Sequence, residues 1–263
     1  MNFPTTLLLG AIAGFTIFLG LPLARRRDFS PSWHALLNAT ATGILLFLLW
    51  DVITKASEPI EASIGSAKAG QPATFALLLV LFAAGFGVGL MSPSVAGGRI
   101  FLSPGRSEPN IETNAKRLAL LIAIGIGLHN LSEGLAIGQA SRSGELSLAL
   151  VLIVGFGLHN ATEGFGIVGP LGGVLRPGWG FLALTGLIAG GPTFVGTALG
   201  YAVRSEPAFV LFLAMAAGSI FYVIAELLNV GRKLGMRRLT MPGVLIGFLA
   251  GYGSDLVLTW AGA

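Results

Sequence analysis

The sequence predicts an all-α polytopic membrane protein with eight transmembrane helices and both termini outside, packed as an inverted-repeat helical bundle. Three observations predict this fold class. Of the 263 residues, 54% are hydrophobic and only 11% are charged, whereas a soluble domain carries about 25% charged residues. The apolar residues gather in long segments, and a ten-residue motif recurs in two neighbouring segments. This composition excludes a soluble globular enzyme and a disordered chain.

Eight segments contain the roughly 20 mostly apolar residues that a membrane-spanning helix needs. In chain order they cover 3–24, 34–53, 73–91, 117–138, 147–168, 180–200, 208–229 and 240–260. A loop is predicted to begin at Ser92, Pro93 and Ser94 after the third segment, and Gly169 with Pro170 closes the fifth. We therefore expect the whole chain, 1–263, to form a single transmembrane domain.

The distribution of basic residues predicts the orientation of these spans. Twelve of the 16 Lys and Arg residues lie in the loops after spans one, three, five and seven, which are therefore predicted to be cytoplasmic. The first span is followed by Arg25, Arg26 and Arg27 and has no basic residues before it, so we expect it to be retained and not cleaved as a signal peptide. The four tryptophans fall at span ends, as an interfacial belt requires. The net charge of +4 thus reflects membrane topology, and no nucleic-acid partner is expected.

Several classes of chemistry are excluded by missing residues. The chain has no cysteine, which excludes disulfides, thiolate metal sites and cysteine nucleophiles. No P-loop motif is present, so hydrolysis of ATP by this chain is not expected.

Ionisable residues inside the predicted spans are costly and are candidates for function. Residues 125–134 read GIGLHNLSEG and residues 155–164 read GFGLHNATEG, identical at seven of ten positions. In each copy a His and a Glu four residues later lie on one face of a helix: His129 with Glu133, and His159 with Glu163. A lone intramembrane His is most often structural, but a duplicated pair of such costly residues favours a functional site.

The two motif copies predict a metal site near the middle of the membrane. Spans four and five run in opposite directions, so the copies can face each other across a pseudo-two-fold axis, as in many transporters. Two imidazoles and two carboxylates suit Zn²⁺, Fe²⁺, Mn²⁺ or Co²⁺. Glu226 in span seven and Asp255 in span eight are open to two interpretations, a pairing role or a place along a pathway. Asp51 lies near the end of span two and is expected to reach the membrane interface.

At these motifs the chain resembles the ZIP (Zrt/Irt-like) family of divalent metal transporters, in its prokaryotic-type branch. The segment 129–134, HNLSEG, is similar to the family's span-four signature, and 159–164, HNATEG, is similar to its span-five signature. A supporting likeness in span seven covers 217–222, AGSIFY, and 225–228, AELL. The resemblance implies a binuclear site with a primary set and a second set of ligands. The primary ligands would be His129, Glu133, His159 and Glu163, and Asn130 and Asn160 would join the shared carboxylates at the second metal.

Two positions depart from the family pattern. Thr162 stands where the family usually has proline, and Gly191 stands where a span-six carboxylate before a proline would serve the second metal. On this alignment Gly191→Glu is expected to strengthen the second site.

The function that we predict from the sequence is transport of divalent transition-metal ions toward the cytoplasm, with Zn²⁺ first and Fe²⁺, Mn²⁺ and Cd²⁺ as alternatives. The metal would be the transported substrate, and no prosthetic group and no enzymatic activity are expected. The predicted partners are divalent metal ions and the lipid bilayer of the cell membrane, with a homodimer as one option for the assembly. Two alternatives are an intramembrane metal-dependent hydrolase and a proton-coupled carrier of an organic solute.

Overall fold

The computed structural model describes residues 1–25, 30–101, 110–143, 153, 157, 160–161, 163–171, 174–202, 205–233, 235 and 237–260, and the regular elements among them are all helical. The α-helices are α1 (Phe3–Phe15), α2 (Pro31–Ala62), α3 (Ile64–Lys68), α4 (Ala73–Phe101), α5 (Ile111–Ser143), α7 (Trp179–Ala202), α8 (Glu206–Lys233) and α9 (Arg237–Trp260). The 3₁₀ helices are η1 (Thr16–Leu19), η2 (Leu21–Arg25) and η3 (Gly169–Leu171).

Short polar residues begin several of these helices, because they replace the hydrogen bonds that the first backbone amides lack. The Asn2 side chain accepts a hydrogen bond from the Thr5 amide at 3.0 Å at the start of α1. Asn110 accepts from the Thr113 amide at 2.8 Å at the start of α5. Ser30 precedes Pro31 at the start of α2, where proline is favoured because the first helical amide needs no partner.

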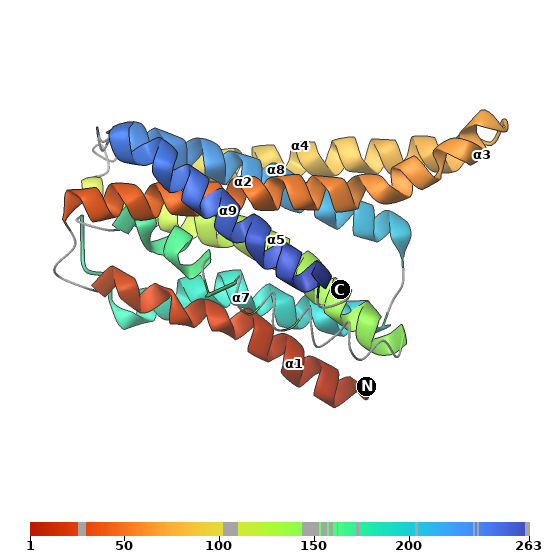
Figure 1. Ribbon diagram of the computed structural model, residues 1–263, viewed down its shortest axis with the longest axis horizontal. Coiled ribbons are helices and arrows are strands. Elements are labelled where there is room, and N and C mark those ends of the chain that lie inside the picture. The colour runs from red at the N-terminus through yellow and green to blue at the C-terminus, as the bar shows by residue number, and fades with distance from the viewer. Residues whose placement is uncertain are drawn as a thin grey trace.

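The helices form two groups that meet along α5 and α8 (Figure 1). In one group α7 packs against both α5 and α1. In the other group α8 packs against α4 and α2, and α2 packs against α9. The buried core between the groups includes Ile122 and Ile126 of α5, Ile220 of α8 and Leu48 of α2. The two groups therefore share one core, and α5 lies at its centre.

The surface of this bundle is apolar, as a lipid-facing surface must be. Large hydrophobic side chains are widely exposed, including Leu8 at 61%, Val80 at 63% and Leu245 at 58%. Six helical segments are long and apolar enough to cross a membrane by length and composition: Phe3–Arg25, Ala35–Lys68, Ala73–Ser92, Ile111–Gln139, Trp179–Ala202 and Glu206–Arg232. They coincide with the predicted spans one to four, six and seven, which confirms the all-helical membrane fold.

The total of eight spans stays a prediction. Most of the predicted span at 147–168 lies outside the described residues. The described part at the end of this span, 163–168, is helical. The predicted span at 240–260 forms α9 but is not one of the six segments above. Helix α1 begins, and α9 ends, toward the end of the bundle at which the α2–α3–α4 hairpin projects beyond the other helices (Figure 1). The two termini thus share one side, while the assignment of that side as the outside stays a prediction.

Two element boundaries differ from the sequence-based expectation. Helix α4 continues through Pro93 to Phe101, although a loop was expected from Ser92. A proline removes one hydrogen bond, to the carbonyl four residues earlier, and the helix can resume beyond it. The predicted first span is not one continuous α-helix, because α1 ends at Phe15 and η1 and η2 complete the segment.

Candidate metal site

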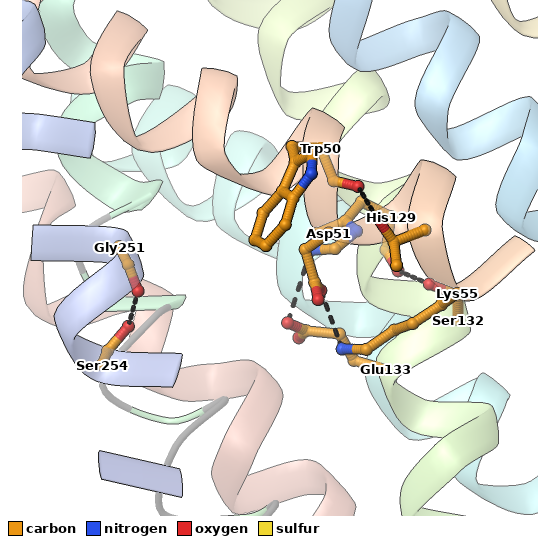
Figure 2. Close-up of polar contacts among 9 residues, drawn as sticks. Trp50, Asp51, Lys55, His129, Ser132, Glu133, Gly251 and Ser254 are labelled. Atoms are coloured by element: carbon orange, nitrogen blue, oxygen red, sulfur yellow. Dashed lines mark hydrogen bonds and ion pairs between the residues drawn. The ribbon is translucent and has the colours of Figure 1, made fainter. Parts of the chain in front are cut away.

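The first copy of the repeated motif lies on α5, on a face turned to the interior of the bundle. His129, Asn130 and Glu133 are at most 4% exposed. His129 Nε2 lies 3.4 Å from Glu133 Oε1 (Figure 2), so the four-residue spacing brings the two groups together as predicted. Glu133 Oε2 has no hydrogen-bond partner among the described residues. A buried carboxylate oxygen in this condition is costly, and a bound cation would offset that cost.

The asparagine of each motif copy is held by a backbone carbonyl of a neighbouring helix. Asn130 Nδ2 donates to the Ala189 carbonyl of α7 at 3.0 Å, and Asn160 Nδ2 donates to the Ala13 carbonyl of α1 at 3.0 Å. Both side chains are fully buried. Within the part of the chain that the structure describes, neither Oδ1 atom has a hydrogen-bond partner. Each amide is therefore fixed through its nitrogen and leaves its oxygen as a potential ligand.

The glycine at the end of each motif copy also lies against the backbone of a neighbouring helix in an equivalent way. A Cβ at Gly134 would overlap the carbonyl oxygen of Thr193, and a Cβ at Gly164 would overlap the carbonyl oxygen of Ile17. In both copies the glycine contact lies four residues beyond the carbonyl that the asparagine binds. The two copies thus pack in the same way, the first against α7 and the second against α1 and η1. These glycines permit close backbone approach, whereas α5 itself runs unbroken through Gly134.

Glu163, from the second motif copy, lies close to the first copy. Its side chain is 2% exposed, and it interacts electrostatically with the Glu133 carboxylate and with the Asn130 amide. It also lines a small cavity with residues of α2 and α5, among them Ile44 and Ile126. Two ionised carboxylates buried near each other repel strongly, and a cation between them would remove that repulsion.

The prediction for His159 is not tested, because His159 and Thr162 lie outside the described residues. Within the described ranges, no group of three or more His, Asp and Glu side chains meets the geometry for holding a metal ion. Of the predicted ligands, the structure brings His129 to Glu133 and brings Glu163 to Glu133 and Asn130. Asn160 is placed against α1.

Two charged residues of α2 lie near the motif and were missed as site residues. Asp51 was expected at the membrane interface, yet its carboxylate and the ammonium of Lys55 both interact electrostatically with Glu133 (Figure 2). Lys55 Nζ lies 2.7 Å from Asp51 Oδ2. Asp255 of α9 also interacts with this pair. The Asp-x-x-x-Lys spacing at the end of span two was the signal in the sequence, since it puts both residues on one helix face.

Glu226 lies elsewhere on the interior-facing side of α8. It is half-buried and interacts electrostatically with Tyr222, one turn away. The charged groups that act on Glu133 and Glu163 do not include it. Its role in pairing or along a pathway stays a prediction.

Gly191 faces an apolar groove between α5 and α7. The groove has a volume of about 600 Å³, and its lining includes Gly127, Leu131 and Gly191 but none of the five predicted ligands that the structure describes. On α5, the residues that line it occupy the side of the helix away from His129 and Glu133, by the 100° rotation per residue. This placement argues against the alignment that puts Gly191 at a second metal.

We accordingly expect Gly191→Glu to bind the same number of Zn²⁺ ions per chain as the unmodified protein, because the added carboxylate would face the groove. The measurement is equilibrium dialysis followed by elemental analysis of metal and protein. Asn130→Asp is the matched control, since it adds the same charge inside the motif and should raise the affinity. An additional bound ion in Gly191→Glu would restore the alignment-based assignment.

Comparison with known families agrees with the geometry. A family model described as ZIP Zinc transporter matches residues 104–252, a segment that includes both motif copies, α7, α8 and much of α9. No curated protein matches the chain.

Proposed function

This chain belongs to the ZIP zinc transporter family, and on that premise we propose that it moves Zn²⁺ toward the cytoplasm through the duplicated His/Asn/Glu motif. The family and the apolar helices make it a multi-pass membrane transporter of divalent metal ions. The proposal adds the metal, the direction, the location in the cell membrane and the residues that hold the ion.

The observation that carries the proposal is the pair of buried carboxylates, Glu133 and Glu163, contributed by the two motif copies. Both are at most 4% exposed, and they interact electrostatically with each other. Burying one ionised carboxylate is expensive, and a second ionised carboxylate nearby adds mutual repulsion. A divalent cation would relieve both effects, whereas an apolar solute would relieve neither.

The proposed ligands combine charge with selectivity. Glu133 and Glu163 supply the negative charge, and the imidazole nitrogens of His129 and His159 favour Zn²⁺ over the hard ions Mg²⁺ and Ca²⁺. The Oδ1 atoms of Asn130 and Asn160 are further oxygen ligands. Because each amide nitrogen is bound to a backbone carbonyl, each oxygen is already oriented before metal arrives. Such anchoring of ligands typically changes metal affinity by about 10–100-fold.

The burial of the motif implies alternating access. A site whose described side chains are at most 4% exposed exchanges its ion with water only when neighbouring helices move. Relative movement of one helix group against the other, with the ion held between them, would open the site to one side at a time.

Metal uptake by the purified protein in liposomes tests this proposal. Zn²⁺ accumulation is expected with protein present and without ATP or an organic solute. Uptake of a proton-coupled organic solute without metal would favour the carrier alternative, and metal-dependent cleavage of a lipid or peptide would favour the hydrolase.

Metal binding is expected to weaken as the pH falls from about 7.5 to about 5.5. Protons compete with the metal for imidazole nitrogens and carboxylate oxygens, so each ligand must be deprotonated to bind. Isothermal titration with Zn²⁺ at a series of pH values measures the change. His129→Gln is the matched variant, because it keeps a polar side chain of similar reach and should bind more weakly with a shallower pH dependence. An unmodified protein whose affinity is flat over this range would contradict histidine ligation.

A further inference from the structure

A basic side chain, Lys55 of α2, lies beside the acidic motif. Its ammonium is 2.7 Å from Asp51 Oδ2, and the side chains of Lys55 and Asp51 are 44% and 19% exposed (Figure 2). The same ammonium interacts electrostatically with Glu133 of α5 and with Asp255 of α9. The charge of one cation, paired with Asp51, thus also acts on carboxylates of two other helices.

This position lies between the motif and one end of the bundle. Helices α2 and α5 run in the same direction, and α2 continues past Lys55 to Ala62, where the hairpin projects beyond the other helices (Figure 1). Lys55 is therefore closer to that end than Asp51 is, by one helical turn. On the orientation predicted from the basic loops, this end faces the outside.

An ordinary helix-surface ion pair accounts for only part of this arrangement. Asp and Lys four residues apart stabilise a solvated helix slightly through their mutual attraction. Here Asp51 is mostly buried, and Lys55 also acts on Glu133 and Asp255, which belong to other helices. Pairing within α2 alone would not require either of these longer-range interactions.

We propose that Lys55 is a built-in, displaceable cation at the approach to the metal site, and that it sets the metal concentration at which transport is half-maximal. The inference rests on the proposed function. The ammonium would occupy the acidic approach formed by Asp51, Asp255 and Glu133 until an arriving metal ion displaces it. Its four-carbon stem is flexible enough to swing toward water without movement of the helix.

The physical consequence is selectivity for divalent over monovalent cations. A dication attracts each carboxylate about twice as strongly as an ammonium does at the same distance and can also coordinate the oxygens directly. A monovalent ion such as Na⁺ has no such advantage over the ammonium. Lys55 therefore raises the KM for metal, and in return it keeps monovalent ions out of the acidic approach.

The test is Zn²⁺ uptake into liposomes by Lys55→Met, which keeps the length of the side chain and removes its charge. The KM for Zn²⁺ should fall by about threefold or more, because a nearby positive charge is removed. Lys55→Arg keeps the charge and should retain the KM of the unmodified protein. Lys68→Met is the matched control, since Lys68 is an exposed lysine on α3 at the tip of the same hairpin and its loss should leave the KM unchanged.

The outcomes separate this inference from the proposed function. An unmodified protein that transports no metal would overturn the proposed function and the role of Lys55 with it. A protein that transports metal, with the same KM in Lys55→Met as in the unmodified chain, would overturn only the role of Lys55. If Lys55→Met does not fold, Lys55→Gln makes the same comparison with a shorter neutral side chain, and an unchanged KM there has the same meaning.

Discussion

Glu163→Gln and His129→Ala are each expected to reduce Zn²⁺ uptake by more than about 100-fold at equal protein level, since loss of an outer-shell partner alone costs roughly 10–100-fold in metal affinity. Glutamine has nearly the volume of glutamate, so Glu163→Gln removes charge without opening a cavity. Glu163 is 2% exposed and interacts with Glu133, and neutralising it removes half of the buried negative charge that we propose attracts the ion.

The measurement is the initial rate of Zn²⁺ uptake into liposomes that contain equal amounts of folded protein, checked by size-exclusion chromatography. Glu61→Gln is the matched control, because it makes the same chemical change at an exposed position of α2. Its uptake should equal that of the unmodified protein. Uptake in Glu163→Gln or His129→Ala that matches this control would remove those residues from the site.

Gly134→Ala is expected to destabilise the protein by about 3 kcal/mol, the upper part of the range for overpacked positions. A Cβ at this position would lie well inside van der Waals contact with the Thr193 carbonyl oxygen and close to the Thr197 amide. Both are backbone atoms, so no side-chain rotation can relieve the overlap and α5 must move away from α7. That movement would also disturb the hydrogen bond from Asn130 to Ala189.

Gly191→Ala, which is the same chemical change, is expected to have the opposite effect on stability. A Cβ at Gly191 meets no atom within 4 Å, so alanine should stabilise α7 by up to about 1 kcal/mol through its greater helix propensity. Thermal unfolding of both variants in detergent compares them directly. A Gly134→Ala protein with the same Tm as Gly191→Ala would show that α5 and α7 are not in backbone contact at this point.

The positions of the membrane-spanning helices along the chain could be predicted wherever a long apolar segment is enough to specify a span. Long apolar runs predicted the spans that became α2, α5, α7 and α8, because a bilayer needs about 20 apolar residues whatever the neighbouring helices are. Boundaries were harder to predict. Helix α4 extends through Pro93, because a single proline removes one hydrogen bond and does not oblige the helix to end.

The sequence predicted which residues of the motif lie together in the candidate site, but it did not predict which residues of other helices surround them. The four-residue spacing of His129 and Glu133 predicted their contact, since helix geometry alone fixes it. Repetition of the motif predicted that Glu163 would join them. Contacts between helices that are distant in sequence were not predictable, and so neither the interaction of Asp51 with Glu133 nor the groove beside Gly191 was foreseen. Both depend on how α2 and α7 rotate about their axes against α5, which one sequence does not determine.

Anomalous X-ray diffraction at the zinc absorption edge, from crystals of the unmodified protein grown with Zn²⁺, tests most directly the claim that this motif holds the transported ion. The account predicts a strong peak inside the bundle, about 2.0–2.2 Å from His129 Nε2 and from oxygens of Glu133 and Glu163, as Zn²⁺ ligation requires. Zinc found only at surface residues such as Glu58 and Glu61, with no peak at the motif, would contradict it.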